Sequence, residues 1–145
     1  KTTFLRDCAR CFSNGIGVAR PFLTAVSDER NELSASRDGV PVLDLGMRTD
    51  VITGVPKSLA IPMLVRNMAP EVLITDELLG EEDMLAFLRA SACGVAVLAS
   101  IHAGSEADLL KKHWLGSGSF KVFMLRRSLD RFILSEADLA RKKPC

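Results

Sequence analysis

The sequence has no excess of charge of either sign and no apolar run long enough to cross a membrane. Its 19 Lys and Arg residues nearly match its 18 Asp and Glu residues, which gives a formal net charge of +1. Proteins that grip nucleic acid carry a basic excess, so this balance predicts no nucleic-acid partner. The longest apolar stretch, from Gly94 to Ile101, is far shorter than the roughly 20 residues that span a bilayer. No charged-then-apolar leader precedes the first expected helix, so we expect a chain that by itself is neither secreted nor membrane-spanning.

A second closely spaced cysteine pair is also absent. A structural zinc site needs four converging ligands, whereas the sequence has a single CxxC among its four cysteines, which are Cys8, Cys11, Cys93 and Cys145. The CxxC pair instead shares one helical stripe with Phe4 and Phe12, at spacings of i, i+4, i+7 and i+8. This pattern predicts buried, reduced thiols in a cytosolic protein.

The chain also lacks an initiator methionine, because it opens on "KTTFLRD". This start predicts an internal fragment or a processed chain with further residues upstream. A length of 145 residues with 48% hydrophobic content is typical of one domain, or part of one, over residues 1–145. The charged last residues, 136–145, are predicted to form a solvated tail.

Four short apolar runs predict strands that alternate with helices. The runs show no alternation of polar residues, which predicts strands buried on both faces and therefore parallel and covered by helices. They are Pro21–Val26, Glu71–Asp76, Gly94–Ser100 and Phe120–Leu125. Helical spacing of apolar residues predicts helices over Phe4–Phe12, Ser58–Asn67 and Glu82–Ala92. The alternation predicts an α/β fold.

Three regions have weaker patterns. Pro62 removes a backbone hydrogen bond, which predicts that the second helix starts only at about Leu59 to Ile61. Residues 31–54 contain several glycines and little periodicity, which predicts a long loop or irregular hairpin. A short strand is expected near Phe132 to Leu134, after a turn at Ser128 to Asp130.

Acidic residues follow the strand in "VLITDE". Nucleotide-hydrolysing sheets need a carboxylate at the carboxyl end of a buried strand to hold magnesium, often with a second beside it that takes a proton from water. Asp76 and Glu77 stand at those positions. Acids that cap a helix or lie on the surface are the alternative interpretation.

The opening residues resemble the end of a phosphate-binding loop. In GxxxxGK[ST] the Lys contacts phosphates, the hydroxyl ligates magnesium, and the helix that follows points free N–H groups at the anion. Lys1 and Thr2 match the last two positions of this motif, but a Lys-Thr pair before a helix is also commonplace.

Two further stretches place polar residues at strand ends. His102 in "VLASIHAG" follows a buried strand and could sense a γ phosphate, or it could be a surface loop residue. "VSDERNEL" brings Asp28, Glu29 and Arg30 to the same sheet edge, where open α/β sheets bind ligands. An acidic cluster that starts a helix is the alternative.

With these residues in view, the chain resembles the stage III sporulation protein AA family from Lys1 to about Leu125. The segments that carry the resemblance are "KTTFLRDCAR", "SDERNEL", "DLGMRTDVITGVPKS", "LVRNMAPEVLITDE" and "SIHAGS". The resemblance implies an ATPase related to the motor ATPases of type II secretion and type IV pili, with a RecA-like P-loop core, ATP and Mg²⁺ as cofactors, and a hexameric assembly. It also implies that the core is incomplete, because the first strand and the glycine loop would precede Lys1.

Carried over residue by residue, the resemblance assigns a role to each matching position. Lys1 and Thr2 would end the Walker A loop, Asp76 and Glu77 would be the Walker B pair, Glu29 would lie in the acidic box, and His102 in the sensor. Arg48 and Arg66 match arginines of the family's most specific segments, which implies a role at the γ phosphate or a subunit interface. A salt bridge that orders the loop is the alternative for both arginines.

The resemblance also implies a cellular role. The protein would power assembly or transport at the channel that links the mother cell to the forespore. It would be cytoplasmic in the mother cell and peripheral to the outer forespore membrane, through a membrane-protein partner such as stage III sporulation protein AB. A related cyanobacterial and plastid family, which joins a similar core to a single-stranded nucleic-acid-binding module, is an alternative. A catalytically inert fragment is another, since loss of a central strand would leave the edges of two neighbouring strands unpaired.

Overall fold

The computed structural model describes residues 1–112, 122–128 and 131–137. The chain divides into two compact units, Lys1–His102 and Ala103–Cys145, which are described separately. Whether the two units act as one domain stays a prediction.

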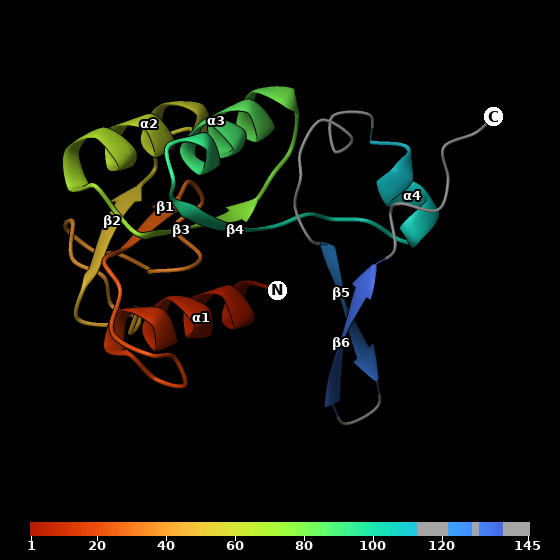
Figure 1. Ribbon diagram of the computed structural model, residues 1–145, viewed down its shortest axis with the longest axis horizontal. Coiled ribbons are helices and arrows are strands. Elements are labelled where there is room, and N and C mark those ends of the chain that lie inside the picture. The colour runs from red at the N-terminus through yellow and green to blue at the C-terminus, as the bar shows by residue number, and fades with distance from the viewer. Residues whose placement is uncertain (113–121, 129–130, 138–145) are drawn as a thin grey trace. The chain divides into compact units, whose positions relative to one another are not determined.

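The first unit is a parallel sheet between two helical layers (Figure 1). Its strands, in the spatial order β2-β1-β3-β4 and all parallel, are β1 (Thr24–Asp28), β2 (Thr49–Thr53), β3 (Val72–Glu77) and β4 (Ala96–Ser100). One face is covered by α1 (Thr2–Asn14), and the other by α2 (Lys57–Met68) and α3 (Glu81–Ala92). This architecture confirms the predicted α/β fold and is consistent with a RecA-like core.

The central strands are buried on both faces, as their unbroken apolar runs predict. Successive strand residues point to opposite faces. Val26 and Ile74 accordingly pack in the core beneath α1, whereas Ala25 and Leu73 pack in the core beneath α2 and α3. The sheet is therefore the middle layer of the unit, with one apolar core on each face.

The buried stripe of α1 differs from the predicted one. Leu5 and Ala9 are buried, whereas Phe4 is 41% exposed. Cys8 is half-buried against the core and Cys11 is half-buried, and both are free thiols. Burial raises the pKa of the Cys8 thiol to about 11. The buried residues of α1 are thus Leu5, Ala9 and Ser13, one position further along the helix than the predicted stripe.

The loop over residues 31–54 is ordered and contains a strand that the sequence pattern did not predict. Strand β2 pairs with β1 in parallel, with Val26 opposite Val51. Only one neighbour and partial burial leave β2 without a continuous apolar run. Before β2, Gly46 has φ +92° and lies so close to α1 that a Cβ would be 2.4 Å from the Cβ of Ser13. The backbone N–H of Arg48 donates to Ser13 Oγ at 2.6 Å, which fixes the entry to β2.

Helix α2 begins earlier than the sequence predicts. It starts at Lys57, and Pro62 lies inside it on the exposed side. The proline removes only its own backbone hydrogen bond. The first turn is closed by the N–H groups of Leu59 and Ala60, which donate to the carbonyl of Pro56. Burial of Ala60 and the neighbouring apolar residues outweighs the lost bond.

Loss of a central strand was predicted to leave the edges of two neighbouring strands unpaired, but the sheet has no such gap. Strand β3 pairs directly with β4, with Leu73 opposite Val97. That prediction is wrong for this structure, because the two strands satisfy each other's backbone groups.

The second unit contains α4 (Glu106–Leu110) and a two-stranded antiparallel sheet, β5 (Val122–Ser128) and β6 (Arg131–Ala137). The run Phe120–Leu125 was predicted to join a parallel sheet, and this is wrong. Only two residues separate the strands, and so short a connection allows only an antiparallel pair. The predicted short strand near Phe132 is part of β6. The predicted tail begins inside β6, and its residues 138–145 lie outside the described residues.

Among the residues that the structure describes, none of the helices has the length and apolar character needed to cross a bilayer.

Candidate functional site

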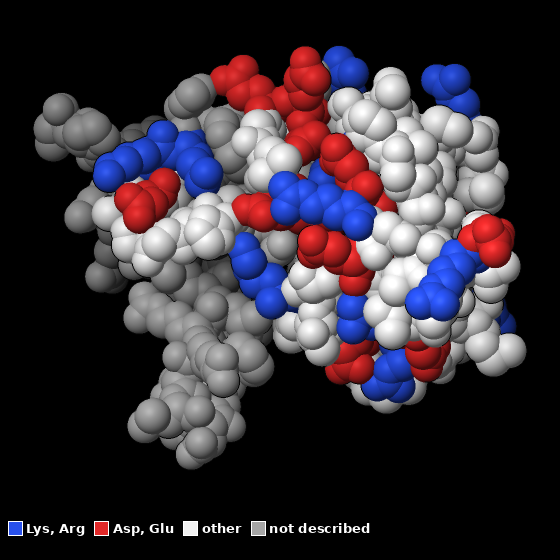
Figure 2. Space-filling view, turned by 180° about the vertical axis from the view of Figure 1, so that it is seen from behind, with Lys and Arg blue, Asp and Glu red and all other residues white. Residues whose placement is uncertain are grey.

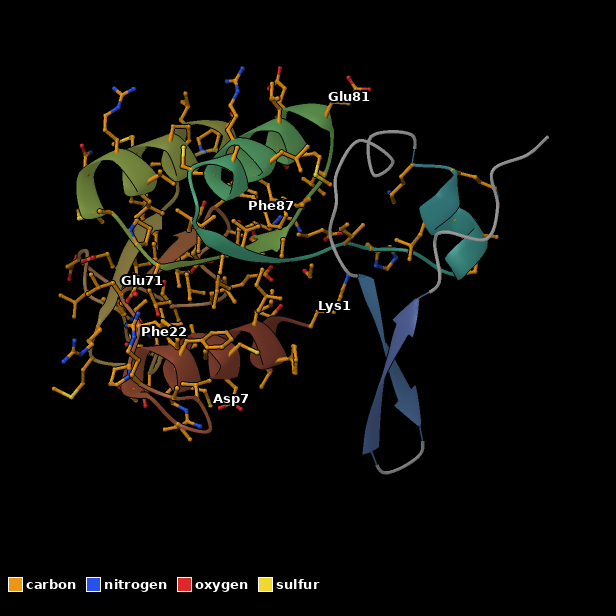
Figure 3. The ribbon with its side chains drawn as sticks, in the orientation of Figure 1. Lys1, Asp7, Phe22, Glu71, Glu81 and Phe87 are labelled. Carbon is orange, nitrogen blue, oxygen red and sulfur yellow. The ribbon has the colours of Figure 1, made fainter. Side chains whose placement is uncertain are left out.

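All four strands of the first unit end at one edge of the sheet, called here the carboxyl edge; the opposite edge is the amino edge. Helix α1 begins at the carboxyl edge, because Lys1 Nζ donates to the carbonyl of Ile101, 3.1 Å away and one residue beyond β4. Figure 3 shows Lys1 at this end of the sheet and Glu71, which precedes β3, at the other. The start of a helix and the ends of the strands therefore meet at one edge, where open α/β sheets bind ligands.

A buried lysine lies at the centre of the carboxyl edge. Lys57, the first residue of α2, has a side chain that is only 1% exposed. Its Nζ lies 2.7 Å from Asp76 Oδ1 at the end of β3 and 2.8 Å from Glu29 Oε2, just after β1. The structure thus brings the predicted Asp76 and Glu29 together through one ammonium group.

The three charges shift one another's protonation. Burial lowers the pKa of Lys57, but its hydrogen-bonding contacts with Asp76 and Glu29 outweigh burial and leave the pKa raised. The hydrogen bond from Lys57 lowers the pKa of Glu29. Burial raises the pKa of Asp76, against the opposing attraction of Lys57. Lys57 is therefore charged at neutral pH and holds a negative partner.

Asp76 presents a buried oxygen to a cation. Its Oδ1 is buried, and its close contact among the described residues is the Lys57 ammonium, 2.7 Å away. A carboxylate at the end of a strand also suits a hard cation such as Mg²⁺, which binds one or two carboxylates and keeps waters. Within the described part of the chain, no three His, Cys, Asp or Glu side chains gather in a group that could hold a metal ion. A cation at Asp76 would need water or phosphate oxygens as further ligands.

Asp28 has a structural role beside the site. Its fully buried carboxylate accepts hydrogen bonds from the backbone N–H groups of Glu32, Leu33 and Ser34 and from Ser34 Oγ. Arg6 of α1 donates to the carbonyls of Glu32 and Leu33. Asp28 therefore folds the loop that positions Glu29, and its own oxygens are occupied.

Glu77 is half-buried at the end of β3 and faces Arg30. Arg30 Nη1 lies 3.8 Å from Glu77 Oε2. The strand pairing is irregular here and sets Glu77 opposite Ser100 of β4, while the N–H of Leu78 donates to the Ser100 carbonyl. Asp76 and Glu77 thus present one buried and one accessible carboxylate at the same edge.

The remaining predicted residues divide between the two edges. Thr2 is half-buried in the first turn of α1, and His102 is exposed beside Ile101. Arg48 lies just before β2, where its carbonyl accepts from Thr24 N–H at the start of β1, and Arg66 lies in the last turn of α2. Both arginines are exposed and lie at the amino edge, roughly 16 Å from the carboxyl edge across a five-residue strand. A role for them at a subunit interface stays a prediction.

Sequence reasoning missed Lys57. A lysine at the start of a helix is normally solvated, and nothing in its immediate neighbours indicates burial. The available signal was its place in "PKS", inside a segment that carries the family resemblance.

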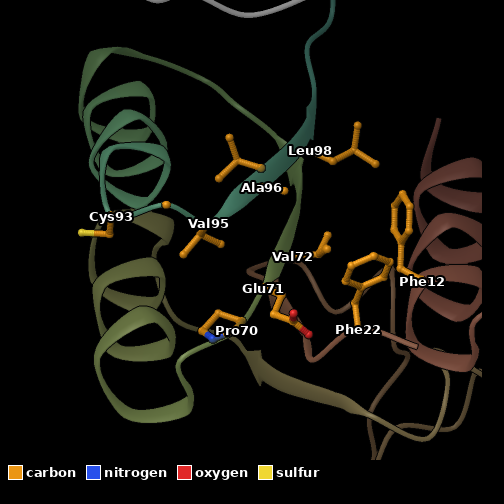
Figure 4. Close-up of a pocket in the computed structure, with 11 residues that line it drawn as sticks. Phe12, Phe22, Pro70, Glu71, Val72, Cys93, Val95, Ala96 and Leu98 are labelled. Atoms are coloured by element: carbon orange, nitrogen blue, oxygen red, sulfur yellow. The ribbon is translucent and has the colours of Figure 1, made fainter. Parts of the chain in front are cut away.

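An apolar cavity of about 620 Å³ lies elsewhere, at the amino edge (Figure 4). Phe12 and Phe22 line one side, and the first residues of β3 and β4 line the other. It contains none of the predicted site residues. On the face seen in Figure 2, basic and acidic side chains are interspersed, and neither sign forms a continuous patch.

Comparisons with known proteins agree with the sequence motifs. The profile of the family described as "Sporulation stage III, protein AA" matches residues 1–143. Stage III sporulation protein AA of Bacillus subtilis (strain 168) is 39% identical over 133 residues, which are 92% of this chain and 42% of that protein. The chain therefore spans less than half the length of this relative. No solved structure matches the chain.

Proposed function

The chain belongs to the sporulation stage III protein AA family, which supports a role in sporulation, and from this premise we propose that its carboxyl edge binds and hydrolyses ATP. One observation carries the proposal. Asp76 and Glu77 end a buried parallel strand at the edge where α1 begins and where Lys1 reaches Ile101. P-loop ATPases need this combination of a helix start, a lysine and strand-end carboxylates.

Each residue at this edge has a proposed role. Lys1 and the first N–H groups of α1 bind phosphate oxygens. Thr2 and the Asp76 carboxylate hold Mg²⁺, which neutralises charge on the phosphates. Glu77, the more accessible carboxylate, orients the attacking water and accepts its proton. His102 responds to loss of the γ phosphate.

At the level of the whole protein, the proposal extends to assembly and location. Identical subunits form a hexamer in which hydrolysis moves neighbouring subunits, and Arg48 or Arg66 acts across the interface. The hexamer works at the channel between the mother cell and the forespore, on the mother-cell side. A membrane protein such as stage III sporulation protein AB recruits it. Family membership supports these expectations, which need tests on the whole protein.

The test compares two Glu→Gln variants in the protein that carries this chain. Glu77→Gln should retain binding of a fluorescent ATP analogue while turnover falls roughly 10²- to 10⁴-fold, because the amide cannot accept a proton. Glu71→Gln is the matched control, because Glu71 lies at the amino edge and should leave turnover unchanged. Phosphate release and analogue binding are the two measurements.

Equal turnover by the wild type and Glu77→Gln would show that the role assigned to Glu77 is wrong. Absence of analogue binding in the wild-type protein would contradict the proposed function altogether.

A further inference from the structure

Burial of the Lys57 ammonium at the first position of α2 is energetically unfavourable. A buried ammonium group is tolerated only when it is paired, and among the described residues Lys57 is the one lysine that is fully buried. It is also the first residue of α2, where the helix dipole disfavours positive charge. The first turn of α2 contains no acidic residue to offset that effect. The compensation comes from outside the helix, through Asp76 and Glu29.

The two carboxylates that pair with Lys57 differ in their exposure to solvent and in their freedom to move. Asp76 is 7% exposed and fixed at the end of a central strand, whereas the side chain of Glu29 is 35% exposed after β1. Lysine carries its charge on a flexible stem of four carbons, so its ammonium can move while the helix stays in place. Glu29 can therefore keep the ammonium if Asp76 releases it.

The contact at Asp76 falls on the carboxylate that the proposed function assigns to Mg²⁺. Lys57 Nζ lies 2.7 Å from the buried Oδ1 of this carboxylate. Two cations that contact the same oxygen repel each other strongly in a site with little water. Lys57 and a divalent cation therefore exclude each other at this atom.

We propose that Lys57 is the resident counter-ion of this site, neutralising Asp76 when no divalent cation is bound and moving to Glu29 alone when one binds. The inference rests on the proposed function in treating Asp76 as the metal-binding carboxylate. Glu29 is then a positioning residue that receives the displaced ammonium. Lys57 opposes binding of the metal in the absence of other ligands.

The experiment measures Mn²⁺ binding without nucleotide, from the EPR signal of free Mn²⁺. The proteins are the wild-type chain, Lys57→Met and Lys57→Gln, the last of which keeps a hydrogen-bond donor in case the Met variant does not fold. Both variants should bind Mn²⁺ at least tenfold more tightly than the wild type, because the competing cation is gone. Mg²⁺ should also raise the melting temperature of these variants more than that of the wild type.

Two controls separate competition from a general loss of charge or structure. Lys111→Met removes an exposed lysine, 78% exposed and paired with Asp108, and should leave Mn²⁺ affinity unchanged. Adding Asp76→Asn to Lys57→Gln should abolish the gain. If Lys57 only stabilised the fold, its loss would weaken Mn²⁺ binding or leave it unchanged, and either result would overturn the inference.

Failure of this inference is distinguishable from failure of the proposed function. Unchanged Mn²⁺ affinity in the Lys57 variants, together with loss of turnover in Glu77→Gln, would refute the counter-ion role alone. Tighter Mn²⁺ binding in a protein that binds no ATP analogue would refute the ATPase alone.

Discussion

The two edges of the sheet each carry an ion pair that joins segments distant in sequence, and the two pairs differ in burial. At the carboxyl edge, Lys57 and Asp76 are 1% and 7% exposed. At the amino edge, Arg20 and Glu71 are 58% and 35% exposed. Arg20 makes a bidentate contact with Glu71 and also lies 4.6 Å over the ring of Phe22.

The difference shows what each pair can do. An exposed pair is screened by water and salt and adds little stability. Arg20 and Glu71 therefore link the segment before β1 to the start of β3 with only a small gain in stability. A buried pair costs desolvation of both ions and depends on each partner for compensation. Such a pair, at the edge where open α/β sheets bind ligands, favours a functional role over a stabilising one, since apolar side chains would hold the same elements together at lower cost.

The largest expected loss of stability comes from removing Lys57 at the carboxyl edge, and removal of Arg20 at the amino edge is the comparison. Lys57→Met should lower the free energy of unfolding by about 3–5 kcal/mol, because it leaves a buried carboxylate uncompensated. Arg20→Met should cause a clearly smaller loss. Urea denaturation of both variants at neutral pH makes the comparison, and equal losses would mean that burial does not distinguish the pairs.

A smaller effect is expected at Asp28, which supports the carboxyl edge without charge pairing. Asp28→Asn should cost about 1–3 kcal/mol, since an amide group would face backbone N–H groups that now donate to a carboxylate. Denaturation in urea measures the loss. Because Glu29 follows Asp28 directly, the variant should also weaken the Lys57–Glu29 contact. An unchanged midpoint would show that the loop does not depend on this carboxylate.

The smallest expected effect is the pH dependence of the amino edge. The hydrogen bond from Arg20 lowers the pKa of Glu71 from 4.5 to about 2. A lowered folded-state pKa stabilises the fold above the unfolded-state value, and this contribution is lost as pH falls through the folded-state value. The difference in melting temperature between wild type and Glu71→Gln should therefore be full above about pH 4.5 and shrink toward pH 2. A difference that grows with acid would contradict this assignment.

The sequence predicted much of the fold because its central strands carry local signals. The apolar runs that form β1 and β3 predict strands buried on both faces, and the ends of these strands place Asp76, Glu77 and Glu29 at one edge. The run that forms β4 also predicts a strand, but burial on both faces is wrong there, because β4 lies at the edge of the sheet and is only partly buried. The sequence failed where the signal depends on a neighbour. Strand β2 is an edge strand with partial burial, and β5 pairs with the following strand instead of joining a parallel sheet.

The sequence by itself indicated the family, through motifs between Lys1 and about Leu125, and the family profile that matches residues 1–143 confirmed it. The sequence also indicated the positions of the strand-end carboxylates. Only the tertiary structure decided which cation those carboxylates hold. Lys57 is 28 residues from Glu29 along the chain, and no local pattern indicates that its side chain is buried. Burial is a property of packing between distant segments. The structure therefore added Lys57 to a site whose acidic residues the sequence had already indicated.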